Sequence, residues 1–142
     1  MKNSIQIRKA KLSDCNAVYN FGRAKELRNP HGNPPKKWWI EAFVKEKQIF
    51  YVAENTESKK VIGFILGEET TGKVTIFHEL FIEKKFRKHG IGKILIQTAE
   101  KDAKSRGVRA IILYGNKKVS KFLKKGKYEK GLLLNEYVKF IY

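Results

Sequence analysis

A glycine-containing turn between a strand-like run and a helical run constrains the fold of this chain most. Residues 79–86 (ELFIEKKF) have the composition of a strand, and the turn RKHGIG follows at 87–92. Residues 93–107 then repeat apolar side chains at helical spacing and end at Gly107, which fits the left-handed residue after a helix. The stretch from Glu79 to Gly107 therefore predicts a strand, a tight turn and an amphipathic helix.

The composition of the turn predicts an anion site. Gly90 and Gly92 let the backbone approach a ligand closely, and the free N–H groups of the first helical turn point toward it. Arg87, Lys88 and Lys93 add positive charge beside a helix end that already carries a positive partial charge. A phosphorylated ligand is the expected occupant. The glycine spacing alone leaves open the alternative that the turn only joins strand to helix.

The motif around the turn resembles that of a known enzyme family. The Rossmann pattern fails because Leu95 stands where its third glycine belongs, and no P-loop lysine follows. The pattern I-x-x-x-x-R-x-x-G-x-G instead resembles the acetyl-CoA motif of the GNAT acetyltransferase superfamily. The resemblance implies acetyl-CoA or coenzyme A as the cofactor. The cofactor-binding residues it implies here are Phe81, Ile82, Arg87, Lys88, His89, Gly90, Ile91, Gly92 and Lys93.

The rest of the chain predicts an alternation of strands and helices. Strands are expected at 4–10, 49–53, 61–67, 74–82 and 108–114, with a last pair at 132–134 and 138–142. Helices are expected at 13–27, 38–48, 93–107 and 117–125, and the proline-containing segment 29–37 is expected to be irregular. The order resembles the complete GNAT fold, an α/β (α+β) architecture. It implies one domain over 1–142 with a mixed, mostly antiparallel seven-stranded sheet and about four helices.

Acetyl transfer to an amine needs a polarised thioester carbonyl and a base that takes a proton from the nitrogen. By resemblance, a backbone N–H at Phe81 or Ile82 polarises the carbonyl. One branch of the family places a carboxylate base four residues before Ile82, and His78 occupies that position. Glu79 is the alternative base, although strand alternation sends it to the opposite face unless the strand bulges. The absence of any side-chain base is the third possibility.

The last predicted helix departs from the family pattern. The resemblance places a tyrosine acid there, in N-x-x-A-x-x-F-Y-x-K, and Leu123 occupies its position. Ser120, Tyr114 or Tyr128 could replace the acid, the thiolate could leave without one, or the protein could bind the cofactor without efficient catalysis. The cofactor-binding residues implied in this segment are Asn116, Phe122 and Lys125.

The acceptor site implied by the resemblance lies at the segment between the first two helices. Its substrate-binding candidates are His31, Trp38 and Trp39. Adjacent tryptophans cannot share one helix face, so we expect one in the core and the other partly exposed. The expected acceptor is an amine of a protein or peptide, then of a small molecule, and third an aminoacyl-tRNA or a ribosomal protein.

The net charge of +17 adds a second hypothesis. Such a field attracts coenzyme A and nucleic acids and slows the approach of polycations. The alternative function is therefore a basic module of the same fold that binds nucleic acid, tRNA or the ribosome and is weakly catalytic or non-catalytic. The aromatic and basic residues do not interleave in a stacking pattern, which counts against it. A solvated lysine surface without a partner is also open.

Composition sets the remaining expectations. The longest apolar run is too short to span a membrane, and the first residues lack the apolar stretch of a signal peptide, so a cytoplasmic protein is expected. The lone Cys15 predicts a buried filler residue, and the three histidines form no metal-ligand cluster. We expect a monomer or a homodimer.

Overall fold

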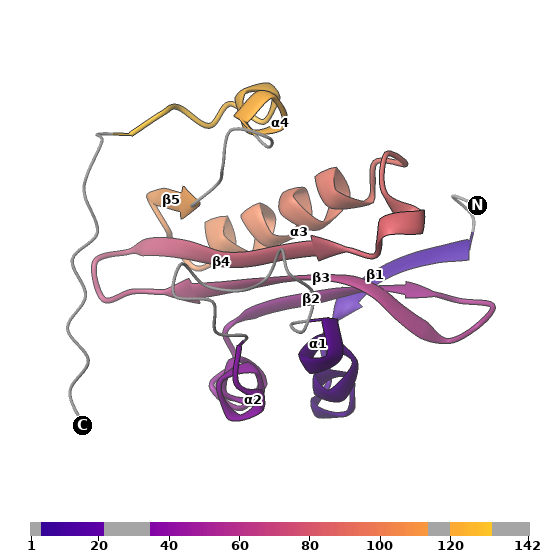
Figure 1. Ribbon diagram of the computed structural model, residues 1–142. Helices are drawn as coiled ribbons and strands as arrows, with labels where there is room; N and C mark the ends of the chain where they lie inside the picture. The colour runs from indigo at the N-terminus through magenta and orange to yellow at the C-terminus, as the bar shows by residue number, and fades with distance from the viewer. Residues whose placement is uncertain (1–3, 22–34, 114–119, 132–142) are drawn as a thin grey trace.

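The computed structural model describes residues 4–21, 35–113 and 120–131, and its elements follow the predicted alternation (Figure 1). Its strands are β1 (Ile5–Lys9), β2 (Ile49–Asn55), β3 (Lys60–Glu69), β4 (Val74–Ile82) and β5 (Ala110–Leu113). Its α-helices are α1 (Cys15–Phe21), α2 (Lys37–Lys45), α3 (Ile91–Ser105) and α4 (Ser120–Lys125). Two short 3₁₀ turns, η2 (Leu12–Asp14) and η4 (Lys84–Phe86), complete the described elements, and the second was not predicted.

The strands form one mixed sheet in the order β1-β2-β3-β4-β5. The first four strands pair antiparallel, and β5 pairs parallel to β4 after the crossover helix α3. These pairings confirm the predicted meander and the βαβ unit. The predicted total of seven strands is not matched, because the described residues contain five strands. The last predicted pair, 132–134 and 138–142, lies outside the described residues.

The helices cover the two faces of the sheet with separate cores. Helices α1 and α2 pack on one face, where Val18, Phe43, Phe64 and Phe81 are buried together. Helix α3 packs on the other face, where Phe77 and Leu95 belong to the second buried cluster. Full burial of one such side chain contributes about 1.5–3 kcal/mol. Cys15 is fully buried in the first core, as predicted, and burial raises the pKa of its thiol to about 11.

Strand β1 is tied to the start of α1 by an ion-pair network. The Arg8 guanidinium donates two hydrogen bonds to Asp14, of 2.8 and 2.9 Å, and a third of 2.8 Å to Glu54 on β2. The Lys11 N–H also donates to Asp14, at 2.7 Å. Burial alone raises the pKa of Asp14, but the bonds from Arg8 and Lys11 outweigh it and hold the pKa below its usual value.

Three helices end in the same Schellman geometry. After α3 the left-handed residue is Gly107, with φ +76°. After α2 and α4 that position holds Lys47 and Lys127, with φ +54° and +64°. At each end the left-handed residue and its successor donate N–H bonds to the last helical turn, for example Lys47 to Val44 and Gln48 to Phe43. The predicted glycine stop is confirmed for α3, whereas lysine takes that role after α2 and α4.

Candidate active site

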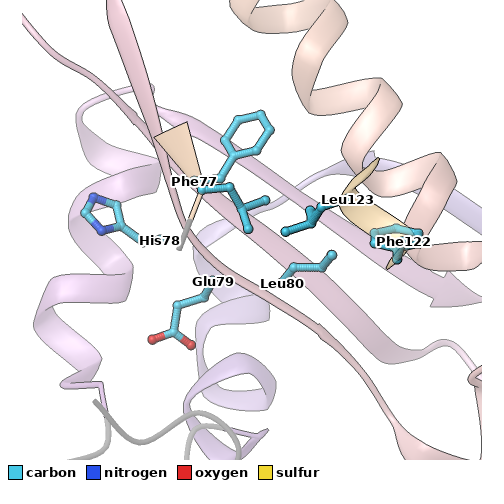
Figure 2. A pocket seen from close by; sticks show the side chains of 7 residues that line it. Phe77, His78, Glu79, Leu80, Phe122 and Leu123 are labelled. Atoms are coloured by element: carbon cyan, nitrogen blue, oxygen red, sulfur yellow. The ribbon is translucent and has the colours of Figure 1, made fainter. Parts of the chain in front are cut away.

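Strand β4 has an open edge over its second half. Its pairing with β5 runs from Val74 to Phe77, opposite Ala110 to Leu113, and no described strand pairs with β4 beyond Phe77 on that side. Helix α4 approaches this edge and borders a partly open cavity of about 110 Å³ (Figure 2). The residues described as lining it are Phe77, His78, Glu79, Leu80, Leu113, Phe122 and Leu123.

A β-bulge sets the direction of the side chains at this cavity. Leu66 of β3 pairs with Glu79, and the next residue, Gly67, pairs with Phe77, so His78 is an extra residue in β4. The bulge reverses the alternation, because Phe77 lies in the core under α3 whereas Phe81 lies in the core under α1 and α2. His78 and Glu79 therefore share the α1–α2 face, which is the exception expected for a strand that bulges (Figure 2).

Glu79 is half-buried, and one of its two carboxylate oxygens lacks a partner in the described part of the chain. Its Oε2 atom is inaccessible to solvent and makes no hydrogen bond within the described chain. Burial disfavours the ionised form and raises the pKa of this carboxyl to about 7. A carboxylate with that pKa changes its charge near neutral pH, which is the property required of a general base.

His78 of β4 lines the cavity, and its ring packs against α2. Its Nε2 lies 2.9 Å from Oε2 of Glu68, and its ring meets the rings of Trp39 and Phe43 edge-on, with centroids 5.5 and 5.9 Å apart. The His78 side chain is 28% exposed. Glu68 was not singled out from the sequence, because only the hairpin pairing of β3 with β4 brings it to His78.

The two predicted tryptophans separate as expected. Trp39 packs against the core on the α1–α2 face and makes an edge contact with Phe43 at 4.8 Å between ring centroids. Trp38 is 70% exposed. The structure therefore brings Trp39, but not Trp38, into contact with His78. The third acceptor candidate, His31, lies outside the described residues.

The hydrogen-bond alternation of β4 identifies which backbone donors face the open edge. Glu83 N–H donates to the Ile62 carbonyl across the ladder at 2.8 Å. In an antiparallel pair such bonds alternate, so Phe81 and Glu79 direct their N–H groups toward β3, whereas Ile82 and Leu80 direct theirs away from it. Of the two donors predicted from the sequence, only Ile82 faces the open edge. Leu80 was missed because a backbone donor leaves no signal in its side chain.

The glycine turn adopts the geometry that an anion site needs. Gly90, at the N-terminal cap of α3, is left-handed with φ +80°. The amides of Ile91, Gly92 and Lys93 open the helix and donate no hydrogen bond to described residues. A phosphate-bearing group fits here, because three amides at a positive helix end lie beside Lys88, His89 and Lys93, all of them solvent-exposed.

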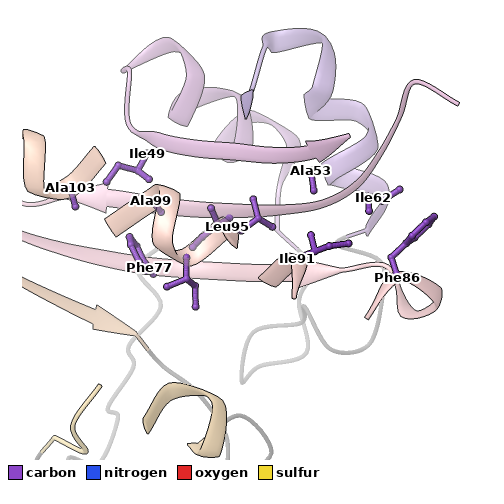
Figure 3. Packing of buried hydrophobic residues seen from close by; sticks show 11 residues of the cluster. Ile49, Ala53, Ile62, Phe77, Phe86, Ile91, Leu95, Ala99 and Ala103 are labelled. Atoms are coloured by element: carbon purple, nitrogen blue, oxygen red, sulfur yellow. The ribbon is translucent and has the colours of Figure 1, made fainter. Parts of the chain in front are cut away.

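Packing holds this turn in place relative to the sheet. Leu95, Ala99 and Ala103 of α3 are almost fully buried against the sheet (Figure 3). Arg87 donates from Nε to the Ile82 carbonyl at 2.7 Å, and its guanidinium lies over the Phe81 ring at 5.3 Å. Arg87 therefore joins the turn to the end of β4, a contact that the sequence motif alone did not reveal.

Helix α4 brings an apolar surface to the cavity. Leu123 lines the cavity at the position where the family motif would place a tyrosine, and Phe122 lines it beside Leu123. Lys125 is exposed on α4, together with Lys121 and Lys124. Of the alternative acids, Tyr128 does not line the cavity, and burial beside Glu100 raises the pKa of its hydroxyl. Asn116 and Tyr114 lie outside the described residues.

Within residues 4–21, 35–113 and 120–131, no group of three or more His, Cys, Asp or Glu side chains is placed to hold a metal ion. No helix in that part of the chain is long and apolar enough to cross a membrane.

Comparison with known proteins gives a family match and structural neighbours. Residues 13–126 match the family described as Acetyltransferase (GNAT) family. A search of curated proteins found no match. An acetyltransferase of Trypanosoma brucei superposes with a TM-score of 0.73 at 15% identity, over 95% of this chain and 99% of that one. Glucosamine-6-phosphate N-acetyltransferase of Arabidopsis thaliana gives 0.72 at 17% identity, over 95% and 99%. PaiA N-acetyltransferase of Thermoplasma acidophilum, in complex with coenzyme A, gives 0.62 at 22% identity, over 87% of each chain.

Proposed function

Because this chain belongs to the GNAT acetyltransferase family, we propose that it transfers an acetyl group directly from acetyl-CoA to an amine. The observation that carries the proposal is the Glu79 carboxyl group at the cavity on the open edge of β4, which has a pKa of about 7 and one buried oxygen without a partner in the described chain. An unpartnered buried oxygen costs free energy, whereas a base needs an oxygen that is free to accept the proton of an amine.

The cofactor would be held by the turn and the open edge. The amides of Ile91, Gly92 and Lys93 bind its phosphates, with Lys88, His89 and Lys93 adding charge at the helix end. Ile82 and Leu80 offer N–H groups to its thioester end, because both face away from β3. Acetyl-CoA, when bound, supplies the activated acetyl thioester.

Glu79 takes the amine proton in the proposed mechanism. In the transfer, the amine nitrogen would form the new C–N bond as the C–S bond of the thioester breaks, and the Leu80 or Ile82 N–H would stabilise charge on the carbonyl oxygen. Glu79 would accept the proton that the nitrogen loses and return it to solvent, and the departing thiolate would take a proton from water, so the protons balance. Leu123 cannot donate one. His78 remains the alternative base, although its Nε2 is already engaged with Glu68.

The acceptor is proposed to enter from the α1–α2 face, where Trp39 and His78 form the wall next to Glu79. A protein or peptide α-amine leads, because α-amino groups titrate near 8 and lose a proton more easily than lysine does. A small-molecule amine is the second class. Neither the structure nor the comparisons support the nucleic-acid alternative suggested by the net charge.

The first experiment tests the cofactor. The purified protein is titrated with acetyl-CoA and with coenzyme A by calorimetry, and release of free thiol is then followed with a panel of peptide and small-molecule amines. We expect both cofactors to bind and thiol release to depend on the amine. Failure of both to bind would overturn the proposal.

A matched pair of variants locates the binding site. Gly92→Glu places a carboxylate at the free amides, and a side chain there meets only ordinary contacts, at 3.9 Å from Ile82 and Phe122. We expect it to weaken binding by about tenfold or more through repulsion of the phosphates. Gly72→Glu makes the same change on an open turn and should leave binding unchanged.

A further inference from the structure

The cavity at the open edge of β4 is small and mainly apolar. Its described lining contains the hydrocarbon side chains of Phe77, Leu80, Leu113, Phe122 and Leu123. The titratable residues, His78 and Glu79, belong to the α1–α2 face, from which the acceptor is proposed to enter. Its volume of about 110 Å³ is well below the 300–1,000 Å³ typical of whole-ligand pockets, so only the end of a ligand enters it.

The same cavity adjoins the turn that is proposed to hold the phosphates. Phe122 lines the cavity, and its ring also lies 3.9 Å from the position that a Gly92 Cβ would occupy. Leu80 lines the cavity as well, and its N–H faces the open edge. A ligand anchored at the α3 N-terminus and extended along β4 therefore places its acyl end in this cavity.

Leucine at position 123 determines what the acyl end meets. Apart from His78 and Glu79, the described lining is hydrocarbon on both the β4 side and the α4 side, and it offers no hydroxyl or amide side chain to a polar group. An apolar cavity of about 150 Å³ holds benzene, a ligand of six carbons, so a cavity of about 110 Å³ has room for about four carbons. With its carbonyl at the strand edge, an acetyl group contributes one methyl and leaves most of this apolar space unfilled.

From these observations we infer that the cavity selects acyl groups of about three to four carbons over acetyl, so that propionyl and butyryl thioesters are the preferred donors. This inference rests on the proposed function, because it assumes that a coenzyme A thioester lies on the open edge of β4. Each added methylene removed from water in an apolar site is expected to tighten binding about fourfold.

The test is a calorimetric series with coenzyme A and its acetyl, propionyl, butyryl and octanoyl thioesters. All share the same phosphates and pantetheine, so ratios of Kd isolate the acyl group. We expect butyryl-CoA to bind about tenfold more tightly than acetyl-CoA, and octanoyl-CoA to bind less tightly than butyryl-CoA because it exceeds the cavity. Equal affinities, or tighter binding of acetyl-CoA, would overturn the inference while leaving the proposed function in place.

Variants at position 123 test whether a preference for a particular acyl-chain length arises from the cavity. Leu123→Phe fills the space and should abolish the butyryl preference while acetyl-CoA still binds. Leu123→Ala enlarges it and should move the optimum to a longer chain. Leu12→Phe, at a side chain that is 50% exposed in η2, is the matched control and should keep the preference. A butyryl preference that survives in Leu123→Phe would place the selectivity elsewhere and overturn the inference. If coenzyme A itself fails to bind, the proposed function fails with it.

Discussion

Glu79 lies on the same face of the sheet as its sequence neighbour His78, because His78 is the extra residue of a β-bulge in β4. Without the bulge, one of the two titratable groups would point into the core under α3. The bulge instead gives the α1–α2 face both a buried carboxylate and an imidazole, next to the open edge where the strands β4 and β5 separate. Bulges concentrate near active sites for this reason, since they redirect side chains without ending the strand.

Glu79→Gln should remove the acidic limb of the pH–rate profile. Burial raises the pKa of Glu79 to about 7, and only the deprotonated form can accept the amine proton. We therefore expect kcat/KM of the protein to rise with pH through about 7, and the variant to lose about 10²–10⁴-fold at pH 8. Thiol release measured from pH 5.5 to 9 with one amine acceptor provides the test.

His78→Gln separates the two candidate bases. If Glu79 is the base, this variant keeps the limb near pH 7. A limb that persists in Glu79→Gln and disappears in His78→Gln would assign the base to His78 instead. A limb that persists in both variants would leave no side-chain base, which is the third hypothesis from the sequence.

Glu79→Gln should also stabilise the fold at alkaline pH. The folded-state pKa of about 7 lies above the unfolded value of 4.5, so the folded protein holds this proton more tightly. The resulting stability is complete below about pH 4.5 and is lost as pH rises through 7, by up to about 3 kcal/mol. We expect the difference in unfolding free energy between variant and parent to move in favour of the variant across that range. Denaturant melts at pH 4.5 and 8 measure it, and a pH-independent difference would contradict the buried-carboxylate assignment.

Asp14→Asn should weaken the fold mainly above pH 4. The hydrogen bonds from Arg8 and Lys11 hold the pKa of Asp14 below its usual value of 3.8, so its stabilising effect is present above that value and lost as pH falls through the folded pKa. At pH 7 we expect a loss of about 2 kcal/mol, because Arg8 keeps Glu54 as a partner. Thermal melts at pH 7 and 3 should show the difference shrinking at acid pH. Glu57→Gln, at an exposed residue, should change neither melt.

Lys47→Gly should stabilise the protein. Lys47 occupies the left-handed position of the Schellman cap after α2, where a side chain is strained and glycine is not. We expect a gain of about 1 kcal/mol in the free energy of unfolding. The reverse change in the same position after α3, Gly107→Lys, should lower it by a similar amount. Chemical denaturation of both variants checks the pair, and a destabilised Lys47→Gly would show that the lysine side chain makes a compensating contact.

Local sequence pattern predicted the helices, strands and turns whose formation depends on residues close together in the sequence. The period of apolar residues identified α3, and Gly107 fixed its end. The meander and the crossover to β5 followed from turn residues and from the short apolar run at 108–114, although β5 begins two residues later, at Ala110. The pair Trp38 and Trp39 separated into exposed and packed positions, because neighbouring residues on a helix point in different directions.

Features that depend on pairing between distant segments were not predictable in the same way. The bulge at His78 arises from the register of β4 against Leu66 and Gly67 of β3, and the amino-acid sequence of β4 alone does not reveal it. The raised pKa of Glu79 is a consequence of that register. The contact of His78 with Glu68 also depends on the pairing of β3 with β4. The same pairing shows that the outward N–H donor is that of Leu80 and not that of Phe81.

The open edge of β4 affects which amino-acid substitutions such a protein can accept during evolution. In the proposed complex, the cofactor is gripped through main-chain amides at Leu80, Ile82 and the α3 N-terminus, and every residue type except proline carries such a group. A substitution at these positions that keeps the backbone path and adds no negative charge therefore removes little recognition. Substitutions at side chains such as Leu123 can then change the substrate preference while the main-chain contacts to the cofactor stay the same.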